Sequence, residues 1–332
     1  HINRTGITIT GLKYDLDYKI SPNFGLDIPM EQISKGDGES TVFSAYSSSV
    51  INLNNNWDTS LGVTAQYFTL NNNLSIEPRV ALKWKINPKH SLALAYGLHS
   101  RREKLDYYFV EKVVNGKNQS NRYLDFSRAH HVGMTYDWNI NQNLHLKIEP
   151  YFQYLFRIPV EKNSSFSVIN HEEFYLDRIL TNTGQGRNYG IDITLEQYMK
   201  NGFYYMITGS LFKSKYRGGD NVWRNTRLDK NYLLNLLAGK EWMVGKLKQN
   251  LLSLNGRLFF QGGERYTPVN EERSQTEHDI FFDETKAYSK RFNPSINGDV
   301  SVSFRINKKR VSHEFSLKIL NVGMRTGMHF YQ

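Results

Sequence analysis

Residues 74–100 show the clearest alternation of apolar and polar side chains in the chain. From Leu74 to Ile86 every second residue is apolar, and the residues between them are small, polar or charged. Successive side chains of a strand point to opposite faces, so this period of two predicts a strand with one apolar and one polar face. The pattern resumes at Leu92 after a short Asn87-Pro88-Lys89 turn, which predicts an antiparallel partner strand.

The length of the first of these strands separates two classes of β protein. Residues 74–86 span roughly 40 Å at about 3.3 Å per residue, whereas strands of soluble proteins usually have about five or six residues. A tilted transmembrane strand needs about nine to eleven residues. One hairpin therefore fits a membrane barrel, but it does not exclude a soluble β-sandwich.

The same alternation recurs along the chain and predicts about thirteen long strands. These lie at 5–13, 41–51, 57–68, 74–86, 92–98, 132–140, 144–156, 189–196, 203–213, 233–243, 250–261, 296–306 and 311–319. Short turns alternate with long connections, which we read as loops at 14–39, 101–127, 157–187, 214–229 and 262–291; the short 71–73 turn is the exception.

Short turns on one rim and long loops on the other are typical of outer-membrane barrels. The predicted fold class is therefore all-β, a transmembrane antiparallel up-and-down β-barrel with its long loops extracellular. A sheet in hydrocarbon must close, and single-chain bacterial barrels have an even number of strands. We expect residues 1–332 to be a fragment of an outer-membrane β-barrel domain that lacks strands at its start and at least one at its end, with 321–332 as a loop.

Composition agrees with a barrel and excludes some alternatives. Aromatic residues make up 14%, with 21 Tyr and 19 Phe, which suits a barrel girdled by aromatic rings. Mean hydropathy is −0.57 and no long apolar run predicts a transmembrane helix. Cysteine is absent, which excludes disulfides and thiolate chemistry. The N-terminal sequence HINRTGITIT has no signal-peptide pattern.

The formal charge of +10 does not predict nucleic-acid binding, because the cations are scattered. The longest run, Lys308-Lys309-Arg310, lies at a predicted turn. Anionic lipid headgroups or an anionic ligand are the partners that this charge favours.

No residue pattern predicts enzyme chemistry, a cofactor or a metal. His130-His131, His171-Glu172-Glu173 and His278 lack metal-ligand spacing, and no nucleophile motif occurs. The pairs Gly218-Gly219 and Gly262-Gly263 are expected to serve turns. We therefore predict neither catalytic nor metal-binding residues.

Ligand contacts are expected from aromatic and arginine side chains in the long loops, because these offer rigid surface and planar donors. The candidates are Arg101, Arg102, Tyr107, Tyr108, Tyr123, Trp223, Arg224, Arg265 and Tyr266. The alternative for Tyr and Trp near strand ends is an interfacial girdle, and Trp57 and Trp84 beside short turns fit that role best.

Three segments resemble the barrel of TonB-dependent outer-membrane receptors: Glu77-Pro78-Arg79, the GGERYTP sequence at 262–268, and FSLKILNV at 315–322. The resemblance implies a 22-stranded barrel around an N-terminal plug domain. It also implies import of a scarce ligand (a glycan, metal chelate, peptide or cofactor) with energy delivered through TonB. The chain departs from the family pattern in having no recognisable plug, no TonB-contacting segment and no terminal strand ending in an aromatic residue.

The leading hypothesis is therefore the barrel of a TonB-dependent transporter in the outer membrane of a Gram-negative cell. Its partners would be outer-membrane lipid, its own plug domain and TonB. A second hypothesis is an outer-membrane barrel acting as scaffold in a secretion or assembly complex, with a surface lipoprotein or a secretion-complex component as partner. A soluble all-β binding protein is the third.

Overall fold

The computed structural model describes residues 1–21, 29–114 and 116–322. The long strands are β1 (Ile2–Ile20), β2 (Glu31–Asn52), β3 (Trp57–Phe68), β4 (Asn73–Asn87), β5 (His90–Arg101), β8 (Ser127–Asn139), β9 (Leu144–Glu161), β10 (Leu180–Lys200), β11 (Phe203–Arg217), β13 (Tyr232–Val244), β14 (Asn250–Gln261), β17 (Ser295–Asn307) and β18 (Ser312–Ile319). The connections hold β6 (Glu111–Val114), β7 (Lys117–Ser120), β12 (Trp223–Asn225), β15 (Arg265–Tyr266), β16 (Lys290–Arg291), α1 (Glu271–Glu277) and the 3-10 turns η1 (Leu105–Phe109), η2 (Val168–Asn170) and η3 (Glu284–Lys286). None of the described helices has the length and apolar character needed to cross a membrane.

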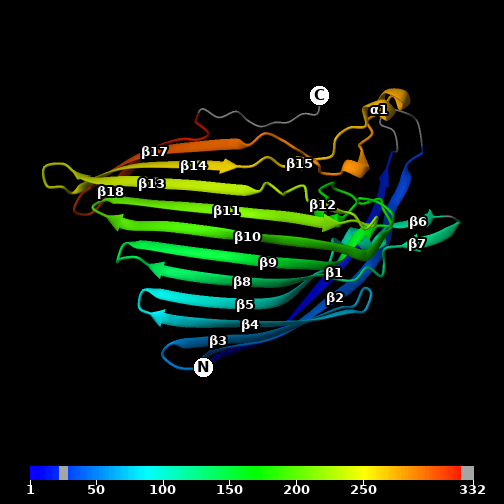
Figure 1. The fold of residues 1–332 in the computed structure, drawn as a ribbon, viewed down its shortest axis with the longest axis horizontal. Helices are drawn as coiled ribbons and strands as arrows, with labels where there is room; N and C mark the ends of the chain where they lie inside the picture. The colour runs from blue at the N-terminus through cyan, green and yellow to red at the C-terminus, as the bar shows by residue number, and fades with distance from the viewer. Residues whose placement is uncertain (22–28, 115, 323–332) are drawn as a thin grey trace.

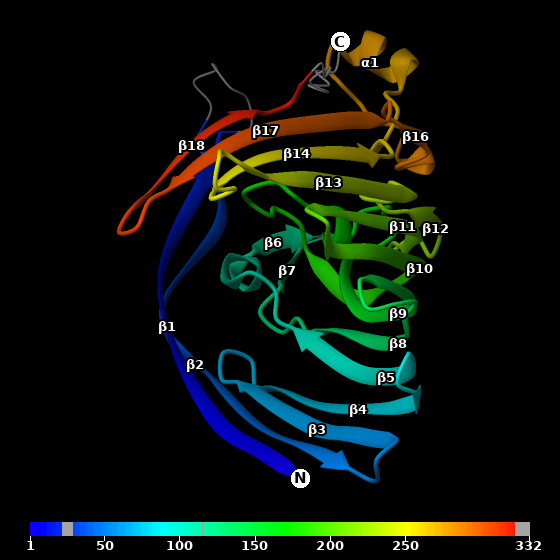
Figure 2. The ribbon, with the colours of Figure 1, turned by 90° about the vertical axis from the view of Figure 1, so that its left-hand side faces the viewer.

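The long strands form one antiparallel sheet in chain order (Figure 1). Short turns and long connections gather at opposite rims, except that the short β3–β4 turn lies with the long connections. The sheet has 14 strands, of which β12 pairs only with β11, so that thirteen long strands remain between the edges β1 and β18. The sheet curves into a trough (Figure 2). The predicted up-and-down wall and its number of long strands are confirmed, and the described sheet stops at its two edges without closing.

The predicted loop at 14–39 is wrong over most of its described part. Strand β1 continues to Ile20 and β2 begins at Glu31, paired from Tyr14 and Gly38 to Ile20 and Glu31. In the same way β9 runs to Glu161 and β10 begins at Leu180, inside the predicted 157–187 loop. In β1 the alternation continues but changes face, because Tyr14 and Leu16 pack toward the inner core whereas Ile7 and Ile9 are exposed outside. In β10 the added residues 181–187 are polar or glycine, so the backbone ladder continues there without side-chain alternation. Residues 22–28 of that predicted loop, and 323–332 of the predicted terminal loop, lie outside the described residues.

The apolar face of the sheet is the convex, outer face. On β4, Leu82 and its alternate neighbours are exposed, whereas Glu77 on the opposite face is 1% exposed. Phe68 shares the face of Glu77 through the β3–β4 register, and its ring lies 5.6 Å from that of Tyr108, in a connection folded against the concave side. Leu82 therefore points outward and Lys83 inward, as the alternation predicts.

Aromatic side chains occupy both ends of the outer apolar band. Trp57 and Trp84 stack at 5.4 Å close to the short turns. Nearer the long connections, the ring of His130 stacks with Tyr96 at 6.0 Å and with Phe156 at 5.0 Å. An apolar band bounded by aromatic rows is typical of a membrane barrel.

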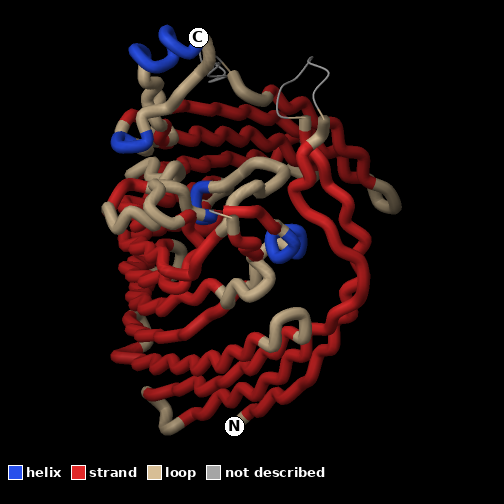
Figure 3. Tube along the Cα trace, turned by 90° about the vertical axis from the view of Figure 1, so that its right-hand side faces the viewer, coloured by secondary structure: helices blue, strands red, loops and turns tan. Residues whose placement is uncertain are grey.

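The buried core lies inside the trough. Residues 102–126, which we call the inward segment, carry η1, β6 and β7 and fold onto the concave side of the sheet (Figures 2 and 3). Its apolar side chains pack with strand residues in one cluster: Tyr107, Tyr108, Phe109, Val110, Leu124 and Phe126 with Tyr14, Val42, Phe68 and Leu180 among others. The described part of the predicted 101–127 loop thus carries secondary structure and fills the long-connection end of the trough.

Strand residues fix the inward segment by shape and by hydrogen bonds. A Cβ on Gly36 would lie 2.4 Å from the Phe109 ring, so only glycine leaves room for that ring. Asn71 and Asn73 both donate to the Leu124 carbonyl, at 2.9 and 2.8 Å. Asn121 accepts from the Leu180 backbone N–H at 2.8 Å. These amide contacts satisfy backbone groups that burial would otherwise leave unpaired.

Candidate functional site

A cavity of about 840 Å³ lies on the concave side, between the inward segment and the ends of β5, β8 and β9. It is lined by Leu12, His99, Ser100, Arg101, Arg102, Glu103, Lys104, Leu105, Tyr107, Ser127, Arg128, Ala129, His131, Leu155, Ile158, Val168, Ile169 and His171. We call it the basic cavity, because four of its side chains are cations and one is a carboxylate.

The one carboxylate of the basic cavity is already engaged. Glu103 is 5% exposed, accepts a short hydrogen bond from the Ser127 hydroxyl and lies 3.5 Å from the Arg101 guanidinium. Its backbone N–H donates to the Tyr108 hydroxyl at 3.2 Å. Glu103 therefore offsets the charge of Arg101 alone, and the cavity keeps an excess of positive charge.

The remaining cations are held by rings and by backbone. The Arg102 guanidinium lies 5.7 Å from the Phe68 ring centre, and the Lys104 ammonium 5.6 Å from that of Tyr107. Arg128 donates to the Leu74 carbonyl at 3.0 Å, while its buried Nε has no hydrogen-bond partner among the described residues. Cations held this way keep their charge available to an anion.

Tyr107 and His171 form the neutral wall of the cavity, with their rings 5.7 Å apart and edge to face. Burial raises the pKa of Tyr107 to about 12, so that its hydroxyl stays protonated and can donate to a ligand. Burial lowers the pKa of His171 below its usual value, and the ring bonds the Tyr175 carbonyl at 3.0 Å.

Acid is expected to loosen the inward segment through His171. A histidine in the undocked chain protonates near pH 6.5, whereas the docked ring resists protonation. The state in which the inward segment packs against His171 therefore keeps its full stability above about pH 6.5. Its free energy of unfolding falls as the pH drops below that value, by at most about 1.4 kcal/mol per pH unit. Hydrogen exchange of residues 102–126 at pH 7.5 and 5.5 measures this loss. In His171→Phe, which keeps an aromatic ring but cannot titrate, equal loss of protection would contradict the assignment.

A second hollow of about 740 Å³ continues along the concave face. It shares His99 and His131 with the basic cavity, and the two rings lie 4.6 Å apart. Buried Glu77 links residues beside the two hollows, because it accepts hydrogen bonds from Gln66 at 3.0 Å and from Arg79 at 3.1 Å and a short one from Ser100. The pair of histidines thus borders both hollows on the inner wall.

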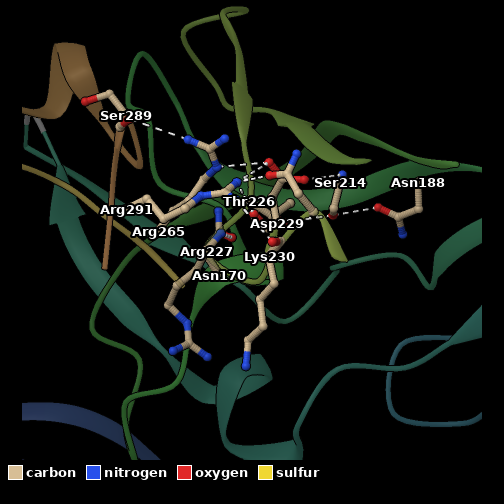
Figure 4. Close-up of polar contacts among 11 residues, drawn as sticks. Asn170, Asn188, Ser214, Thr226, Arg227, Asp229, Lys230, Arg265, Ser289 and Arg291 are labelled. Atoms are coloured by element: carbon tan, nitrogen blue, oxygen red, sulfur yellow. Dashed lines mark hydrogen bonds and ion pairs between the residues drawn. The ribbon is translucent and has the colours of Figure 1, made fainter. Parts of the chain in front are cut away.

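Beside the cavity, a group of ion pairs ties three long connections together (Figure 4). Its centre is Asp229, whose side chain is 0% exposed. One carboxylate oxygen accepts from Arg265 at 2.9 Å, and the other from the Ser214 backbone N–H at 3.0 Å. Arg291 donates to the Asp229 carbonyl at 2.7 Å.

The same group continues through Arg227, which bonds Glu264 at 2.6 Å and makes a close ion pair with Glu172. Lys230 lies 3.1 Å from the other Glu264 oxygen. We call these seven residues the loop clasp: Glu172, Arg227, Asp229, Lys230, Glu264, Arg265 and Arg291. It joins the β9–β10, β11–β13 and β14–β17 connections.

Both glycine pairs allow close backbone approach, and one of them also makes a turn. A Cβ on Gly262 would lie 1.9 Å from the Lys230 carbonyl oxygen, and one on Gly263 would lie 1.8 Å from that of Phe292. Gly219 has the same relation to the Glu161 carbonyl, at 1.9 Å. The expected turn is confirmed at Gly218-Gly219, where the Asn221 backbone N–H donates to the Gly218 carbonyl at 3.1 Å. It is wrong at Gly262-Gly263, which provide room for the neighbouring backbone instead.

The structure brings three of the predicted contact residues together, since Arg101, Arg102 and Tyr107 line the basic cavity. Tyr108 lies beneath it, fully buried, and Tyr123 is 81% exposed. The rest have partners within the chain: Trp223 under Arg187 at 4.4 Å, Arg224 with Asp220 at 2.6 Å, Arg265 in the loop clasp, and Tyr266 stacked on Phe292 at 4.5 Å.

Sequence reasoning missed Lys104, Arg128, His99 and His131. No local pattern marked them, because the predicted strands ended at 98 and began at 132, whereas the observed β5–β8 register continues and places Ser100 opposite Arg128. Among the described residues, no group of three or more His, Asp or Glu side chains is arranged to hold a metal.

Neither a family model nor a curated protein sequence matches the chain. Solved structures do match. The ferric-catecholate import receptor Fiu from Escherichia coli K12 matches with a TM-score of 0.65 and 9% identity, over 96% of this chain and 47% of Fiu. The outer membrane transporter YddB from Escherichia coli matches at 0.61 and 14%, over 88% of this chain and 42% of YddB.

The ferripyoverdine receptor of the Pseudomonas aeruginosa outer membrane matches at 0.61 and 14%, over 89% of this chain and 36% of the receptor. The chain has the barrel fold of TonB-dependent outer-membrane receptors. This confirms the fold that the resemblance of residues 77–79, 262–268 and 315–322 implied. The chain spans less than half the length of each of these receptors, and the basic cavity belongs to this portion of the barrel fold.

Proposed function

We propose that residues 1–332 form part of the barrel domain of a TonB-dependent transporter in the outer membrane of a Gram-negative cell. The outward apolar face with its aromatic rows would meet lipid, and the long connections would face the exterior. The complete protein would add its own plug domain inside the barrel and contact TonB. The outer-membrane receptors named above share the fold, which supports this assignment.

The imported ligand would be anionic and of the metal-chelate class. The observation that carries this is the excess positive charge of the basic cavity. Four cations line it, whereas its one carboxylate, Glu103, is already bound to Arg101 and Ser127. The four cations are Arg101, Arg102, Lys104 and Arg128. The cavity volume of about 840 Å³ suits a ligand of several hundred daltons, since ligand pockets usually measure about 300–1,000 Å³. Fiu and the ferripyoverdine receptor are named for ferric chelates, which supports the same class.

Neutralising the cavity is expected to weaken chelate binding. In the full-length protein in detergent, Arg101→Gln with Arg102→Gln should raise the Kd for a bound ferric catecholate or ferripyoverdine at least tenfold, because two charge-assisted contacts are lost. Quenching of tryptophan fluorescence measures the Kd. Lys308→Gln with Lys309→Gln, which removes equal charge at a short turn, is the control and should leave Kd within about twofold.

Uptake by cells tests transport separately from binding. Accumulation of the radioactive ferric chelate should require both the protein and TonB. Unchanged Kd in the arginine variant, or equal binding of an uncharged analogue, would reject the anionic site. Uptake that persists without TonB would reject the transport mechanism even if the site binds.

A further inference from the structure

His99 of β5 and His131 of β8 lie side by side on the concave face of the sheet. The β5–β8 register pairs His131 with Gly97 and His99 with Ala129, so the two histidines are diagonal neighbours. Their rings lie 4.6 Å apart and are tilted by 41°. Glycine at 97 leaves room for this approach, because a Cβ there would lie 2.7 Å from His99 Nε2. The backbone thus brings two imidazoles together on the inner wall.

The ring nitrogens of this pair are available to a ligand from the trough. Neither ring makes a hydrogen bond among the described residues. The histidines of the outer wall differ, since His90 bonds the Tyr136 hydroxyl at 2.7 Å. In the same way His130 bonds the Tyr96 hydroxyl at 2.9 Å. Both rings of the inner pair are half-buried and border the two hollows, so a molecule in either hollow can reach them.

The spacing of the two rings suits a shared metal ion. Imidazole nitrogens bind Zn²⁺ at about 2.0–2.1 Å, and Cu²⁺ and Ni²⁺ also favour imidazole. If one nitrogen of each ring points at the ion, rings whose centres are 4.6 Å apart subtend roughly 90° there. Two ligands at that angle take neighbouring positions of a square-planar or octahedral ion. A planar macrocyclic chelate does not fit, because it leaves only two opposite positions open.

Neighbouring charges favour a metal that arrives with an anionic chelator. Arg79 lies opposite Gly97 on the same face, and Arg101 follows two residues after His99. Each guanidinium has one carboxylate neighbour, at 3.1 and 3.5 Å, but the two side chains stay 47% and 74% exposed. Guanidinium groups repel a free dication and bind the carboxylates of a chelator. No described group of three or more His, Asp or Glu side chains is arranged to hold a metal, so the remaining ligands must come from the chelator.

We propose that His99 and His131 bind the metal of the imported chelate directly, and so select chelates that have two neighbouring open positions. The metal would be Cu²⁺, Ni²⁺ or Zn²⁺, and the carboxylates of its chelator would be held by Arg79 and Arg101. Only ligands are exchanged: two bound waters leave the ion, two neutral imidazole nitrogens replace them, and the oxidation state is unchanged. A ferric chelate saturated by six oxygens would meet the arginines alone. The inference rests on the proposed function, because it names the coordination of that same ligand.

The test uses the full-length protein in detergent, purified without a histidine tag. Ni²⁺–nitrilotriacetate is anionic and leaves two neighbouring positions open, whereas Ni²⁺–ethylenediaminetetraacetate is anionic and saturated. Isothermal titration calorimetry measures the Kd of each chelate. The variant is His99→Gln with His131→Gln, and the control is His278→Gln with His313→Gln, which removes two exposed histidines elsewhere. Even outer contacts of a metal ligand are worth about 10–100-fold in affinity. We therefore expect the variant to bind Ni²⁺–nitrilotriacetate at least about tenfold more weakly, and the control to change less than about twofold.

Pulsed electron paramagnetic resonance gives a second readout, because it detects imidazole coordinated to bound Cu²⁺–nitrilotriacetate. An imidazole signal in the unmodified protein and the control that is lost in the variant supports the proposal. Absence of that signal from the unmodified protein overturns it, as does an equal Kd for Ni²⁺–nitrilotriacetate in variant and control. An equal loss for the saturated chelate also overturns it, since a saturated ion has no position for imidazole. Free Ni²⁺ that binds more tightly than its nitrilotriacetate complex overturns it in favour of a plain cation site.

The arginine variant separates this inference from the proposed function. Arg101→Gln with Arg102→Gln is titrated with the same two nickel chelates and with the ferric chelate. If it weakens all three while the histidine variant weakens none, the anionic ligand class stands and direct coordination fails. If it weakens none of them, the proposed ligand class fails, and a loss confined to the histidine variant then still supports the metal site.

Discussion

Replacing Asp229 by alanine is expected to destabilise the loop clasp by about 3 kcal/mol, because removing one partner of a buried ion pair leaves the other charges uncompensated. Arg265 and Arg291 both approach this carboxylate, at 2.9 and 3.5 Å. Their own side chains keep partial access to water, which holds the loss to the lower part of the range for buried pairs. The Ser214 N–H also loses its acceptor.

The loss should be confined to the long-connection rim. Hydrogen exchange of residues 214–231 and 262–291 measures it, and the exchange of β4 and β5 should stay unchanged. Asp177→Ala is the matched control, because Asp177 is half-exposed and its contact with Arg178 is 3.9 Å long. If Asp229→Ala and Asp177→Ala raise exchange equally little, the clasp does not hold the connections.

An arginine at Leu94 is expected to cost about 2–4 kcal/mol of folding free energy in lipid, because a charge on the lipid-facing side of a barrel near mid-membrane loses its hydration. Leu94 is 56% exposed on the outer face and pairs with Leu82 and Met134. Urea titration of the full-length protein in phospholipid vesicles, with heat-modified gel mobility as the readout of folding, measures the change.

The neighbouring residue supplies the control. Ala95 faces the trough, where it pairs with Ala81 and Gly133 and lines the second hollow. Ala95→Arg adds the same side chain one residue away and should change the folding free energy by less than about 1 kcal/mol, since lumen substitutions are tolerated. Equal losses at the two positions would show that the convex face does not meet lipid.

The wall of the barrel could be predicted from the sequence because its side chains have two different environments. Leu82 and Lys83 differ in polarity for that reason, and the alternation identifies every long strand between β1 and β18. It was misread beyond Lys13, where β1 continues to Ile20 with its apolar side chains on the other face: Tyr14 and Leu16 point inward, whereas Ile7 is exposed on the outer face. That change of face follows from packing against the inward segment, which no local pattern shows.

The basic cavity was only partly predictable, because folding of the inward segment brings its residues together. Tyr107 and Tyr108 looked equivalent, yet one lines the cavity and the other lies buried under Glu103. The loop clasp was not predictable: Asp229 meets Arg265 and Arg291 across 36 and 62 residues. Which of several arginines pairs with a given carboxylate is decided by how the connections pack, and no local pattern encodes it.

The pairing order of the sheet also bears on how the chain assembles. Each long strand between the edges β1 and β18 pairs with the long strand before and after it, so every described ladder closes a loop of modest length and forms at low entropic cost. The wall can therefore grow one hairpin at a time from a single nucleus. The clasp can form only after the strands that flank its three connections are in place. Substitutions at Asp229 should accordingly speed opening of the rim and leave the rate of wall formation unchanged.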